Sequence, residues 1–385
     1  MILFIVFDVD SLSFYFFISI IQLPDTKLCQ LFIEMQRIGD KGAVALAASL
    51  TKNQSLEKLT VSCDSIYGGG GTAFAQALHT NTSLRLLQLS HNHIGNAGAI
   101  SFGRALTVNF SLKALNLDLN EISDGAILLF RGLHSNSSLR ALNVWGNYLE
   151  DTGVEAFADM LLVNTGLHFV CLKDTQFGER GAVALSAALR VNASLKVLDI
   201  AQNHIRFGGA SAIGEALEVN NCLRALDMTQ NKIGRDGIIR MANALRTNTC
   251  LRDLFVSENR IDDIGVAALA EALQSNSCLE TLILSTNRIG NDGAKSLAAA
   301  LRSNSCLTHL DLAENEISEV GAVAFANVLR ADNCVLLMLD LQRNALDHVR
   351  HAALFTGTLR LNQHLHIRLV HTDGVPFHCL GLTRG

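Results

Sequence analysis

The segment 195-LKVLDIAQNHI-205 recurs, with small changes, as 223-LRALDMTQNKI-233 and 307-LTHLDLAENEI-317. Each copy follows the pattern L-x-x-L-x-L-x-x-N-x-I, in which Ile, Val or Met sometimes replaces Leu. The first leucine of the pattern, the lead leucine, occurs at Leu28, Leu56, Leu84, Leu112, Leu139, Leu167, Leu195, Leu223, Leu251, Leu279, Leu307 and Leu336. A fixed period over most of a chain predicts a repeat architecture in which each repeat is one supersecondary unit.

The spacing between lead leucines is 28 residues, with one exception of 27 and one of 29. The shorter repeat implies a deletion near Asp124, and the longer one implies an insertion near Asp332. Both lie where two predicted elements join, and such junctions tolerate changes in length. The twelve repeats therefore keep one register.

Each repeat has two halves with different periods. The L-x-x-L-x-L half alternates as a short strand with one buried face does. The second half, for example 293-GAKSLAAALRSN-304, has the apolar spacing of an amphipathic helix. Parallel strands stack about 4.8 Å apart but helices need about 8–10 Å. We therefore predict an α/β solenoid, a right-handed β-α superhelix of horseshoe shape, with parallel strands on the concave face and helices on the convex face.

Asparagine recurs in the turn after the predicted strand, at Asn92, Asn120, Asn147, Asn203, Asn231, Asn259, Asn287, Asn315 and Asn344. Gln36, Asp64 and Thr175 take this place in the other repeats. A carboxamide carries both donors and an acceptor, so a column of Asn is suited to pair the backbone groups of stacked turns. We interpret this column as architectural rather than catalytic.

A second Asn precedes each later lead leucine by three residues, as Asn53, Asn136 and Asn220 illustrate. Its place just past the helix predicts a left-handed residue that caps the last helical carbonyls. A Gly, for example Gly98 or Gly265, is predicted to precede the helix in most repeats. These two positions mark the expected ends of the helix.

Composition narrows the class of protein. Apolar residues make up 49% and charged residues 17%, and the net charge is −5. This balance excludes long disorder and gives no electrostatic reason to expect nucleic acid or an anionic membrane surface as a partner. The chain contains no Gly-Lys dipeptide, and no G-x-S-x-G, H-E-x-x-H or C-x-x-C motif. We expect no enzyme activity, no cofactor, no metal and no small-molecule substrate.

The repeat resembles the leucine-rich repeat of the ribonuclease-inhibitor type, and its phrasing is most similar to the repeat domain of NOD-like receptors. That resemblance implies a non-catalytic scaffold or sensor that binds protein partners, in signalling of the innate-immune type. The NACHT module of those receptors has no counterpart here. The resemblance leaves a second reading open, a regulator of an enzyme similar to the Ran GTPase-activating protein or to ribonuclease inhibitor.

The predicted repeat domain covers residues 28–363, between an N-terminal segment, 1–27, and a C-terminal cap or tail, 364–385. Residues 1–23 are very apolar but include no Lys or Arg, and their uninterrupted apolar stretch, 11–23, is too short for a span of about 20 residues. We expect a strand-like cap or a mis-assigned start, with a membrane or secretory role as the alternative.

Histidines and cysteines are unevenly distributed. Six of the thirteen histidines lie near the C-terminus, at His348, His351, His364, His366, His371 and His378. No Cys or carboxylate at zinc-like spacing accompanies them, so we interpret them as part of a polar cap. Nine cysteines, an uneven count without paired spacings, favour a reducing compartment, and we expect a cytoplasmic protein.

The positions two, four and six residues after the lead leucine are predicted to form the concave surface. Trp145, Phe169 and Lys173 lie on two neighbouring predicted strands, an aromatic group beside a charge that is typical of an interface. Asp199, Asp227 and, further along, Phe255 form an acidic surface with an aromatic edge, which suits a basic partner. The alternative is that Trp145 folds against the neighbouring turn and the acids are merely solvated.

Overall fold

The computed structural model describes residues 2–5 (backbone only), 28–330, 335–346, 355, 364 and 366–368. The rest of the N-terminal segment, the insertion near Asp332, and His348, His351, His371 and His378 lie outside the described residues. The chain divides into two compact units, Met1–Phe177 and Gly178–Gly385, the N-terminal unit and the C-terminal unit.

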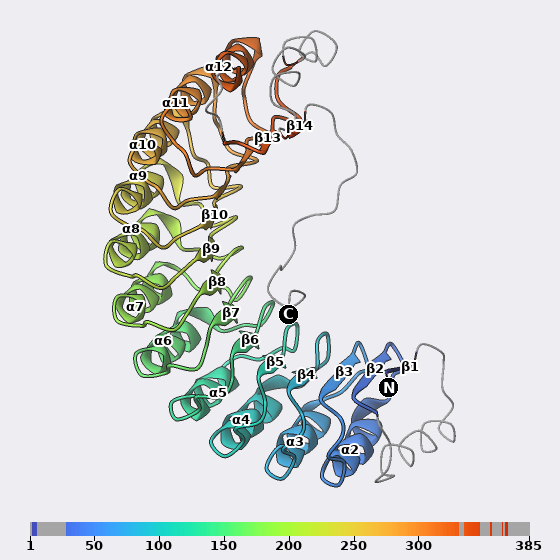
Figure 1. Ribbon diagram of the computed structural model, residues 1–385. Helices are drawn as coiled ribbons and strands as arrows, with labels where there is room; N and C mark the ends of the chain where they lie inside the picture. The colour runs from blue at the N-terminus through green and yellow to red at the C-terminus, as the bar shows by residue number, and fades with distance from the viewer. Residues whose placement is uncertain are drawn as a thin grey trace. The chain divides into compact units, whose positions relative to one another are not determined.

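Strands and helices alternate along the N-terminal unit (Figure 1). Its strands are β1 (Ile2–Ile5), β2 (Gln30–Glu34), β3 (Lys58–Ser62), β4 (Leu86–Gln88), β5 (Ala114–Asn116), β6 (Ala141–Asn143) and β7 (Phe169–Cys171). Its helices are α2 (Gly39–Leu50), α3 (Gly68–Ala77), α4 (Gly95–Leu106), α5 (Gly125–Gly132) and α6 (Glu150–Leu161). The short helix α5 belongs to the 27-residue repeat, so the deletion is absorbed at the start of this helix.

The C-terminal unit has the same alternation. Its helices are α7 (Glu179–Leu189), α8 (Arg206–Leu217), α9 (Gly234–Leu245), α10 (Asp263–Leu273), α11 (Asn291–Ala300) and α12 (Glu319–Leu329). Its strands are β8 (Val197–Asp199), β9 (Ala225–Asp227), β10 (Asp253–Phe255), β11 (Thr281–Ile283), β12 (His309–Asp311), β13 (Met338–Asp340) and β14 (His366–Arg368). Strand β14 lies inside the segment that the sequence assigns to a C-terminal cap.

Within each unit, every strand pairs in parallel with the next strand along the chain. Equivalent residues of consecutive repeats face each other, as Leu226 and Leu254 do. The helices of each unit lie on one side of its sheet and leave the other side uncovered by helices (Figure 1). The predicted class, an α/β leucine-rich repeat solenoid with parallel strands, is confirmed.

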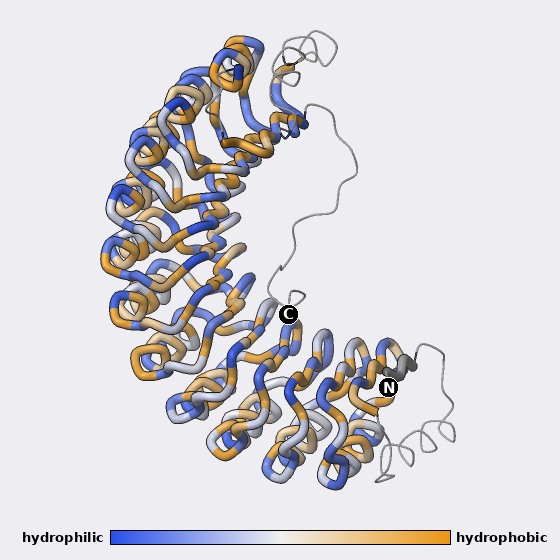
Figure 2. The backbone as a smooth tube through the Cα atoms, viewed as in Figure 1, coloured by the Kyte–Doolittle hydropathy of each residue, from blue (hydrophilic) through white to orange (hydrophobic). Residues whose placement is uncertain are grey.

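The core is a strip between strands and helices that repeats in every turn. In one repeat, the lead leucine Leu223, the strand residue Leu226 and Met228 are fully buried beneath Ile238 and Met241 of α9. Figure 2 shows the same alternation of hydrophobic and hydrophilic residues in repeat after repeat. Because each repeat buries its apolar face against its neighbours, stability grows with repeat number and not with the size of a single core.

The recurring glycine lies inside the first turn of the helix, not before it as the sequence suggested. Gly98 is the fourth residue of α4, and a Cβ there would lie 2.1 Å from Cγ2 of Ile94. Gly265 in α10 is similar, with Cγ2 of Ile238 at 2.6 Å. The glycine is therefore required by the close packing of the turn's Ile and of the neighbouring helix, not by helix termination.

The prediction of a left-handed C-cap at the second Asn column is wrong. None of these Asn residues is among those with positive φ in the described part of the chain. Instead, Nδ2 of Asn81 donates to the carbonyl of Leu50, at the end of the preceding helix, over 2.8 Å, and its Oδ1 accepts from the amide of Leu84. The same bond to the end of the preceding repeat's helix is made by Asn109, Asn136, Asn164, Asn220, Asn248, Asn276 and Asn304. These side chains therefore cap the helix of the repeat before their own and tie two repeats together.

The first Asn column, the asparagine ladder, pairs consecutive turns. Nδ2 of Asn259 donates to the carbonyl of Met228 in the preceding repeat over 2.9 Å and to the carbonyl of Ser257 in its own turn. Its Oδ1 accepts from the preceding repeat's amides of Asn231 and Ile233, at 2.9 and 3.3 Å. A single buried side chain thus satisfies backbone groups that no strand reaches.

Candidate binding surfaces on the strand face

The side chains two, four and six residues after each lead leucine point away from the core and form the strand face. Parallel, in-register pairing arranges them in three rows that run across the strands, called rows two, four and six. Neighbouring members of one row are one strand spacing apart, about 4.8 Å. A partner that lies on this face therefore meets residues from several repeats at once.

Trp145 and Lys173 are neighbours in row six of the N-terminal unit. The Lys173 ammonium lies over the indole ring of Trp145, 5.0 Å from the ring centroid, which is a cation–π contact. The side chain of Trp145 is half-buried. Its Nε1 is buried and has no hydrogen-bond partner among the described residues. Buried indole N–H groups usually find a partner, so this one is an open donor.

Phe169 does not share this contact. It occupies row two of β7, where its register partner is Ala141. Four residues separate it from Lys173, about 13 Å along an extended strand. The structure therefore brings two of the three predicted residues together, and places Phe169 towards the opposite end of the strand. The sequence spacing placed all three residues on the strand face, but it could not show which of their side chains are in contact.

Asp118 precedes Trp145 in row six, and sequence reasoning missed it. Its side chain is only 6% exposed, and its Oδ1 is buried without a hydrogen-bond partner among the described residues. Burial raises the pKa of this carboxyl, while the Ser90 hydroxyl and His91 lower it. Row six thus places a carboxyl, an indole and an ammonium just after the ends of the successive strands β5, β6 and β7. Asp118 could have been predicted from the sequence, because it lies six residues after its lead leucine, as Trp145 does.

Asp199, Asp227 and Phe255 are consecutive members of row four in the C-terminal unit. All three side chains are half-buried. The structure therefore brings these predicted residues together as one row, with two carboxylates followed by an aromatic ring.

The row-four acids also have a local role at the strand ends. Oδ1 of Asp227 accepts the amide of Thr229, two residues on, at 2.8 Å, and Asp199 holds Ala201 in the same way at 3.0 Å. Asn143 makes the same contact with the amide of Trp145. Such Asx turns favour Asp or Asn at the position where a strand ends.

A second pair of row-four acids, Asp311 and Asp340, faces each other across β12 and β13. Burial raises the pKa of Asp311 to about 6, and the charge of Asp340 adds to the increase. The pKa of Asp340 is also raised by burial, against the lowering effect of Arg368, whose guanidinium lies 3.9 Å away. Two close carboxyls thus carry less than two full negative charges near neutral pH.

No three side chains of His, Cys, Asp and Glu among the described residues are arranged to hold a metal ion. No helix in the described ranges is long and apolar enough to cross a membrane. None of the seven cysteines in this part of the chain forms a disulfide.

Comparison with known proteins identifies the class. The family profile described as "Leucine Rich repeat" matches residues 80–103, 108–129, 135–158, 191–214, 219–242, 247–270, 275–298 and 303–326. The chain is a leucine-rich repeat protein. This profile describes a structural repeat, not a catalytic domain. No curated protein sequence matches the chain.

Two solved structures are similar at low sequence identity. The structure titled "Leiomodin-1 Actin-Binding Site 2 (ABS2)" is 22% identical, with a TM-score of 0.36, over 41% of this chain and 89% of its own. An internalin (inlF) from Listeria monocytogenes is 18% identical, with a TM-score of 0.49, over 87% of this chain and 83% of its own.

Proposed function

We propose that this leucine-rich repeat protein is a non-catalytic scaffold or sensor that binds a protein partner on its strand face. The observation that carries the proposal is the contact of Trp145 with Lys173, in which the indole N–H has no acceptor among the residues that the structure describes. An enclosed polar group without a partner costs about 1–3 kcal/mol. A partner that offers a carbonyl or carboxylate to Trp145 and Lys173 regains that free energy on binding.

Row four of the C-terminal unit supplies a second contact surface. Asp199 and Asp227 present carboxylates beside Phe255, a combination that suits a partner segment with basic and apolar side chains. The two surfaces differ in charge, so they select different parts of a partner. We propose no small-molecule substrate and no nucleic acid as ligands.

The same proposal includes the subtype of the repeat, the signalling role and the cellular compartment. The 28-residue repeat, with a strand and a helix in each, supports a repeat of the ribonuclease-inhibitor type, similar to that of NOD-like receptors, acting in innate-immune-type signalling. We propose a cytoplasmic location, because cysteines held as thiols and not as disulfides suit its reducing environment.

A regulator of an enzyme is the second candidate, and the acidic row favours it. Carboxylates at Asp199 and Asp227 would face a basic enzyme such as a ribonuclease. Inhibition of ribonuclease activity by the purified protein, or stimulation of GTP hydrolysis by small GTPases, separates this function from that of a passive scaffold. The acid-to-amide change at both aspartates is expected to remove the inhibition.

The binding surface is tested by quantitative affinity capture followed by measurement of Kd for the captured protein. Trp145→Ala and Lys173→Ala are expected to weaken binding by at least about tenfold, the usual effect of a hot-spot residue. Phe110→Ala and Lys52→Ala are matched controls, because both are exposed residues outside the strand face in the same unit. Equal binding by Trp145→Ala, Lys173→Ala and the wild type would rule out this surface.

A further inference from the structure

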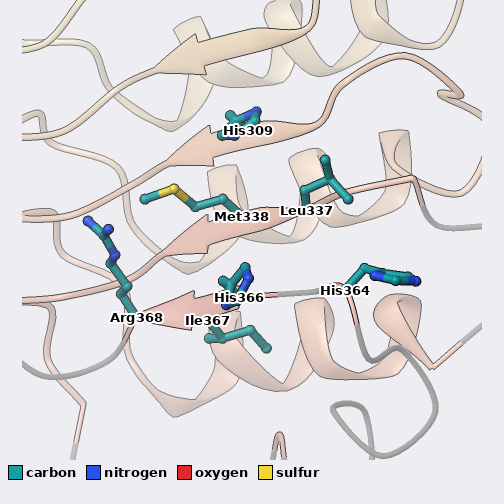
Figure 3. A pocket seen from close by; sticks show the side chains of 7 residues that line it. All are labelled: His309, Leu337, Met338, His364, His366, Ile367 and Arg368. Atoms are coloured by element: carbon teal, nitrogen blue, oxygen red, sulfur yellow. The ribbon is translucent and has the colours of Figure 1, made fainter. Parts of the chain in front are cut away.

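One cavity opens on the strand face of the C-terminal unit, with a volume of about 690 Å³ (Figure 3). It is lined by His309, Leu337, Met338, His364, His366, Ile367 and Arg368. His309, Met338 and His366 occupy the same row-two position on β12, β13 and β14. Met338, which carries a thioether, therefore lies on β13, between β12 and β14, which carry the imidazoles of His309 and His366.

The hydrogen bonds around His309 fix its ring. The Thr308 hydroxyl donates its one hydrogen to the carbonyl of Glu280 at 3.0 Å. In its 2.8 Å contact with Nδ1 of His309, the same hydroxyl must therefore accept, so Nδ1 carries the hydrogen. In the neutral ring the lone pair is then on Nε2. A second group that holds one ring nitrogen in this way is the usual support of a metal-binding histidine.

The donor set selects the kind of ion. No three His, Cys, Asp or Glu side chains of the described residues converge, which disfavours zinc and the hard divalent ions. Two imidazoles with one thioether make a softer set, and thioether ligands favour Cu(I). His309 and His366 are two strand spacings apart, about 9.6 Å between their Cα atoms, with Met338 on the strand between them.

The charges nearby also favour a cation. Asp311 and Asp340 lie in row four directly beside this row, two residues along the same strands. Arg368 offsets part of their charge through its 3.9 Å contact with Asp340. Carboxylates near the cavity attract a cation more strongly than they would in bulk water.

We propose that His309, Met338 and His366 bind one Cu(I) ion in this cavity. The site depends on β14, because that strand supplies the third ligand. It is separate from Trp145, Lys173 and the row of Asp199, so it is a second property of the chain and does not rest on the proposed partner binding.

The test uses the full chain, with its thiols alkylated because cysteine thiolates also bind Cu(I). Cu(I) is supplied anaerobically as its coloured bicinchoninate complex, and transfer to the protein is followed by absorbance. The wild type is expected to take one Cu(I) per chain. Met338→Leu, His309→Ala and His366→Ala are each expected to raise Kd by at least about tenfold, and Thr308→Val by about tenfold through loss of ring orientation.

Matched controls are Met35→Leu and His204→Ala, both exposed residues away from the cavity, which are expected to bind as the wild type does. X-ray absorption of the wild-type complex, expected to show nitrogen ligands and one thioether sulfur, needs no variant to fold. Wild-type affinity in Met338→Leu, a spectrum without sulfur, or Zn(II) binding as tight as Cu(I) binding overturns the proposal.

Discussion

The two units differ in the asparagine ladder. In the C-terminal unit Asn occupies the turn in every repeat from Asn203 to Asn344, whereas in the N-terminal unit Gln36, Asp64 and Thr175 interrupt it. Asp64 is the most informative exception, because it has almost the shape of Asn but carries an ionisable oxygen where the amide would be. The difference shows which part of the carboxamide the turn requires.

Asp64 keeps the acceptor hydrogen bond of the ladder but lacks the donor hydrogen bond that an Asn side chain makes. Its Oδ1 accepts the amide of Gln36 at 2.7 Å, in the way that Oδ1 of Asn92 accepts the amide of Asp64. Nδ2 of Asn92 donates to the carbonyl of Val61, but Oδ2 of Asp64 is buried with no partner among the described residues. The donor half of the side chain is therefore missing in this turn unless the carboxyl is protonated.

The largest effect is expected from breaking the intact ladder. Asn259→Ala leaves the buried amides of Asn231 and Ile233 without an acceptor, while the carbonyl of Met228 keeps only its bond from Nδ2 of Asn231. Unpaired buried groups cost about 1–3 kcal/mol each, so we expect a loss of about 3–5 kcal/mol in unfolding free energy, measured by urea denaturation.

Asn221→Ala, at an exposed position in the same unit, is the control and should change stability by less than about 0.5 kcal/mol. Hydrogen exchange at the amides of Asn231 and Ile233 should rise in Asn259→Ala alone. Equal stability of the two variants would show that the ladder is not needed.

The next largest effect is expected from introducing an Asp, as at Asp64, into the uninterrupted asparagine ladder of the C-terminal unit. Asn259→Asp should cost about 2–3 kcal/mol at pH 8, because the charged form lacks a donor in a buried turn. At pH 4 the protonated acid can donate again, so most of the loss should disappear. Urea denaturation at the two pH values measures the difference, and a loss independent of pH would contradict the explanation.

The smallest effect is expected from repairing the interrupted ladder with Asp64→Asn. Burial raises the pKa of Asp64 to about 6 from an ordinary 3.8; the amides of Gln36, Ile38 and Arg37 lower it, and Glu34 adds a smaller rise. Since the folded pKa is the higher one, the wild type is favoured by protonation below pH 3.8, and its stability falls as the pH rises to about 6. Asp64→Asn should therefore stabilise the N-terminal unit by about 1–2 kcal/mol at pH 7.5 and by almost nothing at pH 3.5.

Thermal unfolding of wild type and Asp64→Asn over this pH range measures the effect. Glu57→Gln is the control for a general change in charge, since Glu57 is an exposed acid of the same unit outside the ladder. A constant difference between Asp64→Asn and wild type from pH 3.5 to 7.5 would mean that Asp64 does not titrate in the folded protein as described.

The sequence by itself determined the repeat, its strand and helix, the parallel order and the buried leucines, because each depends on a pattern that recurs within 28 residues. It also indicated which residues point out of the core, including Trp145, Lys173 and Asp227. A one-dimensional pattern fixes these features, since each repeat contacts only its neighbours.

Only the tertiary structure decided the contacts between repeats. Lys173 reaches Trp145 while Phe169 does not, and the second Asn column caps the preceding helix rather than its own, because both depend on register across strands and on side-chain direction. His366 joins His309 and Met338 only because β14 continues the sheet. Periodicity specifies which side chains leave the core, but the packing of one repeat on the next decides what they meet.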